Sequence, residues 1–195
     1  EGTAWQWTWF VPHDVDGLVN LMGGEDAFVQ KLDSLFTADS SLEGEMISSD
    51  ISGLIGQYAH GNEPSHHVIH LYNYVNRPWR TQELVDSVYQ SQYANSTDGL
   101  SGNEDCGQMS AWYILNSMGF YQVCPGKPIY SIGRPAFDKA VINLPEEKTF
   151  SIVVKNNEKK NKYIESVTLN GQPLNTPFFH HQDIANGDTM EIKRT

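Results

Sequence analysis

Four segments of the sequence combine polar and aromatic residues in ways that packing alone does not require. They are EGTAWQWTWFVPHDVDGL (1–18), GNEPSHH (61–67), NRPWRTQ (76–82) and GLSGNEDCGQMSAWYILNSMGFYQVCPG (99–126). Their carboxylates Glu1, Glu63, Glu104 and Asp105 stand outside any ordinary run of solvated charges. Cleavage of a glycosidic bond needs one carboxylic acid to protonate the leaving oxygen and one carboxylate to activate water or attack carbon. The alternative is that these residues only cap helices and form turns.

The same segments hold candidate metal ligands. His66 and His70 are four residues apart in an expected helix, but the HExxH order and a third ligand at a diagnostic spacing are missing. A hydrogen-bonded histidine pair is therefore the alternative to a zinc site. Asn62 and Glu63 offer the amide and carboxylate oxygens that Ca²⁺ takes, whereas residues 14–17 lack the spacing and terminal Glu of an EF-hand.

The two cysteines allow two interpretations. Cys106 and Cys124 flank an expected helix, and in an oxidising compartment they could pair and close a short loop. They could equally be free and buried as small apolar groups, and neither has the neighbours of an activated thiolate. Asn95-Ser96-Thr97 is a glycosylation sequon, which matters only in a host that glycosylates.

Composition restricts the class of protein. The chain has 195 residues, with 39% hydrophobic and 19% charged, as in a globular protein. Its 24 acidic and 13 basic residues give a net charge of −11, which repels phosphate backbones and excludes a general nucleic-acid binder. No apolar run approaches the roughly 20 residues of a membrane span. The opening residues 1–4 have neither an initiator Met nor the character of a signal peptide, so we expect a mature or trimmed product.

Charge and aromatic residues divide the chain into unlike halves. Residues 1–126 carry 16 acids and three bases, whereas residues 127–195 carry eight acids and ten bases. All five tryptophans precede residue 113. This asymmetry predicts two lobes with different functions. Acidic and aromatic surface suits neutral polar ligands and hard cations, with carbohydrate and calcium as the obvious pair.

The expected elements change character near residue 120. Helices are expected from Gly24-Glu25-Asp26, from Pro64-Ser65 to before Arg77-Pro78, from an N-cap at Thr81, and from about Gly107 to Met118 with Gly119 as its stop. Strands are expected at 121–124, 129–132, 140–144, 150–154, 164–169 and 188–193, with a hairpin at Asn170-Gly171. The fold class is therefore α+β, with a helical lobe over residues 1–120 and a small antiparallel β lobe over residues 121–195.

Taken in order, the four segments resemble the C-terminal half of the catalytic region of glycoside hydrolase family 92. Members are calcium-dependent exo-acting α-mannosidases, many of them described as α-1,2-mannosidases, that are common in gut Bacteroidetes. The resemblance covers about residues 1–137, and YSIGRPAFDKAVINL with the LNG hairpin matches the family's closing β segment more loosely. It implies an N-terminal β-sandwich followed by an α/α toroid of paired helices. It also implies a periplasmic or secreted bacterial enzyme that hydrolyses mannose-containing glycans, including N-glycans.

Family members invert the anomeric centre, so the resemblance implies an acid and a base on opposite faces of the sugar. The general acid falls on Glu1 and the principal base on Asp105. The partner of the base falls on Asn103 or on Glu104, depending on the family variant that is aligned. If it is Asn103, an amide stands where other members have a second acid, and the strength of the base is open.

The resemblance also implies the ligand-binding residues. A calcium ion that contacts the mannose hydroxyls would be held around Asn62 and Glu63. The same pocket would be lined by His13, Asp14, His66 and His67. Because several of these groups start helices, we expect Glu63, His66, His67 and Asp105 to converge on one concave surface, with Glu63 and Asp105 within about 15 Å of each other.

Length sets this chain apart from a complete family member. A toroid needs on the order of 400 residues, and this chain supplies only about five or six helices. We therefore expect part of a larger two-domain enzyme, whose N-terminal part is a partner of this chain. The chain alone should be inactive, since Glu1 is anchored on one side only. One alternative is a non-catalytic carbohydrate-binding protein. A second alternative, a structural domain, explains none of the four segments. The sequence does not determine the linkage preference or the oligomeric state.

Overall fold

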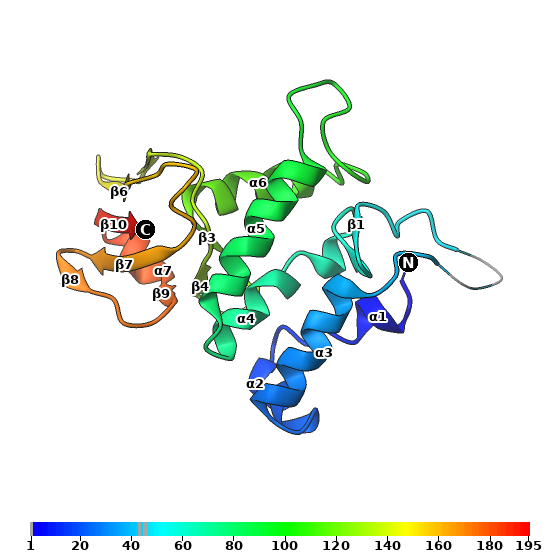
Figure 1. The fold of residues 1–195 in the computed structure, drawn as a ribbon. Helices are drawn as coiled ribbons and strands as arrows, with labels where there is room; N and C mark the ends of the chain where they lie inside the picture. The colour runs from blue at the N-terminus through cyan, green and yellow to red at the C-terminus, as the bar shows by residue number, and fades with distance from the viewer. Residues whose placement is uncertain (1, 43, 45–46) are drawn as a thin grey trace.

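The computed structural model describes residues 2–42, 44 and 47–195. Its helical elements are α1 (Ala4–Trp7), α2 (Val15–Leu21), α3 (Glu25–Thr37), the 3-10 turns η1 (Glu63–Ser65) and η2 (Val68–His70), α4 (Leu71–Tyr74), α5 (Pro78–Gln92), α6 (Gln108–Met118) and α7 (His181–Ala185). Its strands are β1 (Leu54–Ile55), β2 (Tyr58–Ala59), β3 (Phe120–Tyr121), β4 (Ile129–Ile132), β5 (Lys139–Asn143), β6 (Thr149–Lys155), β7 (Ile164–Leu169), β8 (Gln172–Pro173), β9 (Phe178–His180) and β10 (Asp188–Arg194). Helices gather in one lobe and most strands in another, so the α+β class is confirmed (Figure 1).

Two helices follow the expected pattern closely. Helix α3 begins directly after Gly24 and buries Phe28, Leu32 and Leu35 at helical spacing. Helix α6 lies between Gly107 and a C-cap at Gly119, whose φ angles are 96° and 105°. The left-handed C-cap is the conformation for which glycine is favoured. Local pattern and end signals agree in both helices, which is why the prediction was right.

The single helix expected from Pro64-Ser65 to before Arg77-Pro78 is wrong. This segment forms η1, η2 and the short helix α4, with hydrogen bonds three residues apart, such as His70 N–H to His67 O at 3.0 Å. The rings of its histidines bond to other segments, as His67 does to Trp9 O and His70 to Asn116 Oδ1. These long-range bonds fix the segment in a tighter winding than a regular helix gives.

The N-cap expected at Thr81 is also wrong. Helix α5 begins at Pro78, because proline is favoured in the first helical turn, where its missing N–H is not needed. Thr81 lies inside the helix, fully buried, and its hydroxyl donates a hydrogen bond to Ile69 O at 2.9 Å. It ties α5 to η2 instead of capping a helix.

The β lobe contains a five-stranded sheet in the order β5-β6-β10-β7-β8 and a three-stranded sheet β3-β4-β9. The purely antiparallel arrangement expected is wrong, because β10 pairs parallel with β6 and antiparallel with β7. The final strand inserts between β6 and β7, which buries Met190 and Ile192 completely. The Asn170-Gly171 hairpin is confirmed, with Leu169 opposite Gln172.

Two apolar cores meet at β3. Trp112, Tyr121 and Val123 belong to the core of the helical lobe, whereas Phe120 packs into the core of the β lobe. The boundary expected between residues 120 and 121 falls at this junction, and the division into two domains stays a prediction. In the described residues, no helix is both long and apolar enough to cross a membrane.

Polar contacts from α5 join the lobes. Asp86 forms an ion pair with Arg134 at 3.0 Å, and Glu83 accepts a hydrogen bond from the Tyr163 hydroxyl at 2.6 Å. The Arg134 side chain is only 10% exposed, so its charge depends on this partner. These contacts fix the position of the β lobe relative to helix α5.

Candidate functional site

Four parts of the chain line a pocket of about 460 Å³ in the helical lobe. Its lining residues are Phe10, Pro12, Glu63, Pro64, His66, His67, Asp105, Gln108, Tyr121, Gln122, Val123 and Pro125. The structure thus brings together Glu63, His66, His67 and Asp105 from two separate segments. A larger groove of about 540 Å³, lined by Tyr93 and Tyr113 among others, has no acidic, basic or histidine residue in its lining. Of these two, only the pocket of about 460 Å³ has carboxylate and imidazole side chains in its described lining.

Close contact between two glycines brings the two acidic segments together. Gly102 has a φ of +70°, and a Cβ atom placed on it would lie 2.2 Å from Gly61 O and 2.7 Å from Gly61 Cα. Only glycine permits this approach. The loop before α6 and the β1–β2 hairpin accordingly lie side by side (Figure 1). Asn62 and Glu63 therefore follow one side of the contact, and Asn103–Asp105 follow the other.

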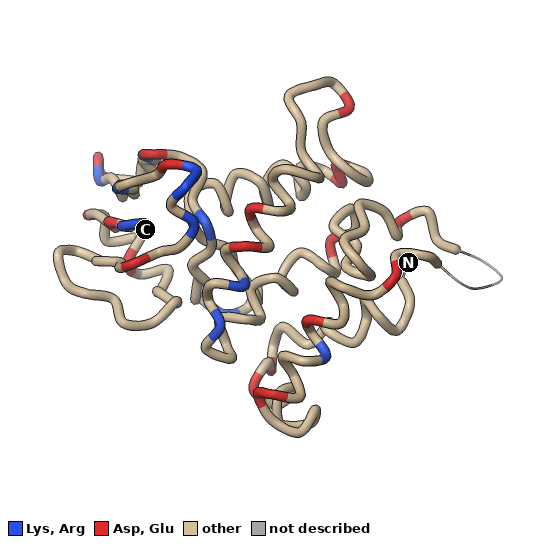
Figure 2. Tube along the Cα trace, viewed as in Figure 1, with Lys and Arg blue, Asp and Glu red and all other residues tan. Residues whose placement is uncertain are grey.

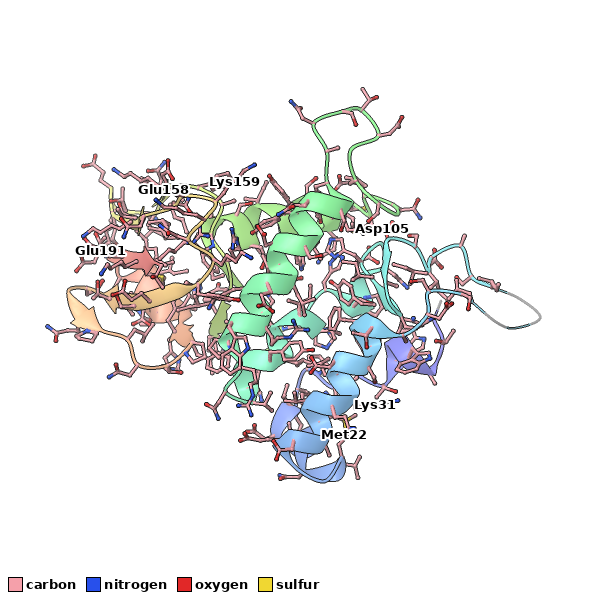
Figure 3. All side chains as sticks on the ribbon, in the orientation of Figure 1. Met22, Lys31, Asp105, Glu158, Lys159 and Glu191 are labelled. Atoms are coloured by element: carbon pink, nitrogen blue, oxygen red, sulfur yellow. The ribbon has the colours of Figure 1, made fainter. Side chains whose placement is uncertain are left out.

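Asp105 enters the pocket from an unusual backbone conformation. The φ angles of Asp105, Cys106 and Gly107 are 45°, 59° and 96°, three left-handed residues in succession. Such residues cost about 1–3 kcal/mol each when they are not glycine, and they cluster at functional sites. Figure 3 labels Asp105 where this loop returns toward the helices. The turn places the exposed Asp105 on the pocket wall.

The two candidates for the partner of Asp105 are oriented differently. The Glu104 carboxylate accepts hydrogen bonds from the Ser110 N–H at 3.0 Å and from the Ser110 hydroxyl at 2.8 Å. It therefore serves the first turn of α6, whose N–H groups have no partner within the helix. Asn103 is exposed. Neither residue is among those that line the pocket, and the identity of the partner stays a prediction.

The two pocket histidines are uncharged near neutral pH. Burial lowers the pKa of His66 to about 4 and lowers the pKa of His67 as well. His66 Nε2 lies 3.0 Å from His60 O, and His67 Nε2 lies 2.8 Å from Trp9 O. Because a carbonyl only accepts, each Nε2–H is a donor in these bonds. Both rings are thus held as neutral walls of the pocket.

His70 lies deeper and does not form a metal site with His66. Its Nδ1 and Nε2 atoms lie 3.0 Å from Ser131 Oγ and 2.9 Å from Asn116 Oδ1. The hydrogen-bonded interpretation of this histidine pair fits these contacts. Within the described residues, no group of three or more His, Cys, Asp and Glu side chains could hold a metal ion.

The remaining predicted residues lie elsewhere. Asp14 caps α2 by accepting a hydrogen bond from Gly17 N–H at 3.0 Å, and His13 is exposed, with its carbonyl bound by the Lys127 ammonium at 2.8 Å. Neither lines the pocket, although Pro12 does. Glu1 lies outside the described residues. Cys106 and Cys124 are free.

Gln108 and Tyr121 are pocket residues that the sequence did not single out. Gln108 Nε2 donates hydrogen bonds to His66 Nδ1 at 3.1 Å and to the Tyr121 hydroxyl at 3.2 Å. Burial, together with the charge of Glu63, raises the pKa of Tyr121 to about 12. The only sequence signal was their presence in the 99–126 segment, since their contacts cross 13 and 42 positions.

Charge in the pocket is one-sided. Its described lining holds the carboxylates of Glu63 and Asp105 but no Lys or Arg side chain. Lys and Arg gather on the β lobe and at its border with α5, whereas the helical lobe carries mostly Asp and Glu (Figure 2). Carboxylates beside neutral imidazole and phenol groups suit a hard cation and hydroxyl-bearing ligands.

Comparison with known proteins identifies the family to which the chain belongs. Residues 1–194 match the model of the glycosyl hydrolase family 92 catalytic domain, and the chain belongs to this family. It is similar to an α-mannosidase of family GH92 from Bacteroides thetaiotaomicron, solved in complex with mannoimidazole, with 39% identity and a TM-score of 0.92 over 100% of this chain and 25% of that one.

Two further relatives extend the comparison. The structure of a GH92 inverting mannosidase from Bacteroides thetaiotaomicron VPI-5482 is 38% identical, with a TM-score of 0.84 over 100% of this chain and 27% of that chain. An uncharacterized secreted glycosidase of Arthroderma benhamiae is 33% identical over 98% of this chain and 23% of its own length. The chain thus spans about a quarter of the length of these relatives.

Proposed function

We propose that this chain is part of a longer family 92 enzyme, an exo-acting and inverting α-mannosidase that removes terminal mannose from glycans with calcium assistance. The observation that carries the proposal is the pocket in which Glu63 and Asp105 meet the neutral rings of His66 and His67. The relatives, which include two named mannosidases, support the substrate class. We expect an α-1,2 linkage, an α/α toroid in the complete protein, and a secreted or periplasmic location.

The donor set near the pocket fits calcium. Asn62, which is 9% exposed, and Glu63, which lines the pocket, bear amide and carboxylate oxygens, the ligands that calcium prefers. Calcium takes six to eight oxygens, so the others would come from backbone, water, the sugar or the rest of the enzyme. When bound, the ion would supply positive charge to sugar hydroxyls. This donor chemistry favours calcium over zinc, which prefers nitrogen and sulfur.

The proposed reaction assigns one proton transfer to each carboxyl group. Asp105 takes a proton from the water that attacks the anomeric carbon, and Glu1 donates a proton to the oxygen of the bond that breaks. An inverting pair lies about 6.5–9.5 Å apart, because the water must fit between the base and the sugar. Asn103 or Glu104 supports the base, and His66 and His67, which line the pocket, contact the sugar. His13 and Asp14 lie outside the lining of this pocket, so contact between them and the sugar would require a ligand that extends beyond it. His66 and His67 act as hydrogen-bonding walls because they are uncharged.

A non-catalytic carbohydrate-binding protein is the second candidate. Asn103 is an amide, and the Glu104 carboxylate is already bound to Ser110, which favours a site without a second working acid. Such a protein would bind mannosides through the same pocket without cleaving them.

Hydrolysis separates the two candidates. The longer enzyme, meaning the polypeptide of its relatives' length that contains this chain, is assayed on α-1,2-mannobiose with calcium and with a calcium chelator. We expect mannose release that the chelator abolishes. Binding of mannobiose without release would support the second candidate, and release that the chelator leaves unchanged would contradict the role of calcium.

A further inference from the structure

A chain of hydrogen bonds in the pocket wall has its direction fixed by one backbone carbonyl. His66 is 1% exposed, and its Nε2 lies 3.0 Å from His60 O. The carbonyl oxygen can only accept, so His66 Nε2 carries the hydrogen. Since the buried ring is neutral, its Nδ1 carries a lone pair and must accept a hydrogen bond from whatever faces it.

Gln108 faces that lone pair. Its Nε2 lies 3.1 Å from His66 Nδ1, and exchanging the amide nitrogen and oxygen would set two lone pairs against each other. The same Nε2 lies 3.2 Å from the Tyr121 hydroxyl oxygen. Both amide hydrogens are therefore donated within the protein, and the orientation of the amide is fixed. The carbonyl oxygen Oε1 is the only polar atom of this side chain that is left.

Gln108 lines the pocket together with Glu63 and Asp105. Among the described residues, no donor forms a hydrogen bond to its Oε1 atom. We propose that Gln108 Oε1 accepts a hydrogen bond from one hydroxyl group of the bound sugar, and that His66 and Tyr121 hold it in that orientation. This makes Gln108 a specificity-determining residue, and the inference rests on the function proposed above.

A fixed acceptor discriminates between ligands that can and cannot donate. If a ligand lacks the matching hydroxyl, Oε1 is enclosed by the ligand without a partner, which is costly. Rotating the amide to relieve this would break the bonds to His66 and Tyr121. The pocket should therefore penalise removal of one hydroxyl more than removal of the others.

The test is a double-mutant cycle between the protein and the sugar in the longer enzyme. Wild type and Gln108→Met, which has a similar size, are assayed on α-1,2-mannobiose and on analogues whose terminal mannose lacks one hydroxyl at C3, C4 or C6. We expect one deoxy analogue to lower the wild-type kcat/KM by about 10-fold to 100-fold. Gln108→Met should lower kcat/KM on the parent sugar by a similar factor and show little further loss on that one analogue.

Gln122→Leu is the matched control. Gln122 also lines the pocket, and its Nε2 likewise donates two hydrogen bonds, to Pro125 O and Lys127 O at 3.2 and 3.3 Å, but within the described residues it has no bond to His66 or Tyr121. This variant should keep the full penalty for the deoxy sugar. Loss of the penalty in Gln122→Leu and not in Gln108→Met would make Gln122 the acceptor and would overturn the inference. Gln108→Leu, checked for folding by circular dichroism, repeats the measurement with a second side chain.

The outcomes distinguish this inference from the function on which it rests. The inference would be overturned if the loss from the Gln108 substitution and the loss from the missing hydroxyl simply added in both Gln108→Met and Gln108→Leu. Gln108 would then only support His66 and Tyr121 and would not contact the sugar. No cleavage of any mannoside by wild type would overturn the proposed function itself, and the inference with it. Loss of the penalty for one analogue in the Gln108 variants alone would support the inference.

Discussion

Asp105 reaches the pocket through a left-handed turn that only the surrounding structure can hold. Replacing it with Asn keeps its size and removes the proton acceptor. In the longer enzyme, Asp105→Asn should lower kcat for α-1,2-mannobiose by about 10²–10⁴-fold, the usual contribution of a general base. Asp26→Asn, exposed in the first turn of α3, is the control and should change kcat little. A loss of less than about threefold in Asp105→Asn would argue against the assigned base.

A substitution of Glu104 can be compared with that of Asp105 to show which carboxylate is the principal base. Its carboxylate is bound by the N–H and hydroxyl of Ser110, so we expect Glu104→Gln to lower kcat less than Asp105→Asn does. Kinetics of both variants under the same conditions check this order. The opposite order would make Glu104 the principal base.

His70 makes stability depend on pH. Full burial lowers its pKa from 6.5 to about 4, so between these values the unfolded chain binds more protons than the folded one. The stabilisation is fully present above pH 6.5 and is lost as pH falls toward 4. The loss should be about 3 kcal/mol from this residue, with further loss from His60, whose pKa burial also lowers.

Urea unfolding at several pH values between 4 and 7.5 measures this loss. His70→Asn should flatten the curve relative to wild type, because the titrating group is gone. His181→Gln, at an exposed position, serves as the control and should leave the curve unchanged. A curve for His70→Asn as steep as that of wild type would contradict the assignment.

At the residue scale, chemistry was predictable where residue type and neighbours were unusual. Glu63 and Asp105 were predictable as site residues because both lie in short segments, GNEP and GNEDCG, that combine carboxylates with Gly and Asn outside any long run of charges. Gln108 and Tyr121 were not, because their role depends on His66, which lies 42 positions from Gln108. Asp14, predicted to contact sugar, is observed as the cap of α2, which is the common use of Asp at that place.

At the scale of elements, the contact between Gly61 and Gly102 is what joins the two acidic segments. Gly102→Ala places a methyl group 2.2 Å from Gly61 O and strains a φ of +70°. It should therefore lower kcat/KM in the longer enzyme by at least about 10-fold, since small displacements at a site are costly. Gly126→Ala, which meets nothing within 4 Å, is the control. Unchanged kinetics in Gly102→Ala would show that this contact does not position the site.

The contacts of α5 with the β lobe allow a stability prediction. Asp86→Ala leaves the buried Arg134 charge without its ion-pair partner, and we expect a loss of about 1–3 kcal/mol. Glu158→Ala breaks the solvent-exposed pair with Lys160, which water screens, and should cost much less stability than Asp86→Ala does. Chemical unfolding of both variants measures the difference. Equal losses would mean that burial of Arg134 does not matter to the junction.

Elements were predictable where local signals and tertiary contacts agreed. The bounds of α3 and α6 followed from apolar spacing and glycine ends. The conformation of the segment from Glu63 to Tyr74 could not be predicted in this way, because hydrogen bonds from its histidines to distant groups override helical propensity. The strand β10 was recognised, but its parallel pairing with β6 depends on insertion between two earlier strands, which no local pattern encodes.

At the scale of the whole molecule, the chain spans about a quarter of its relatives' length. The pocket alone therefore offers only some of the groups that the proposed reaction needs. We expect the 195-residue chain by itself to release no mannose from α-1,2-mannobiose, while the longer enzyme does. Mannose release by the purified chain, sensitive to Asp105→Asn, would contradict this expectation.

The measurement that tests the central claim most directly is proton NMR of the first product formed by the longer enzyme on α-1,2-mannobiose. It follows the anomers of released mannose with calcium, with a chelator, and in Asp105→Asn. The account predicts that β-mannose appears first and that both the chelator and the substitution suppress it. Early release of α-mannose, or release that neither treatment reduces, would contradict the assignment of this pocket as the site of an inverting, calcium-assisted mannosidase.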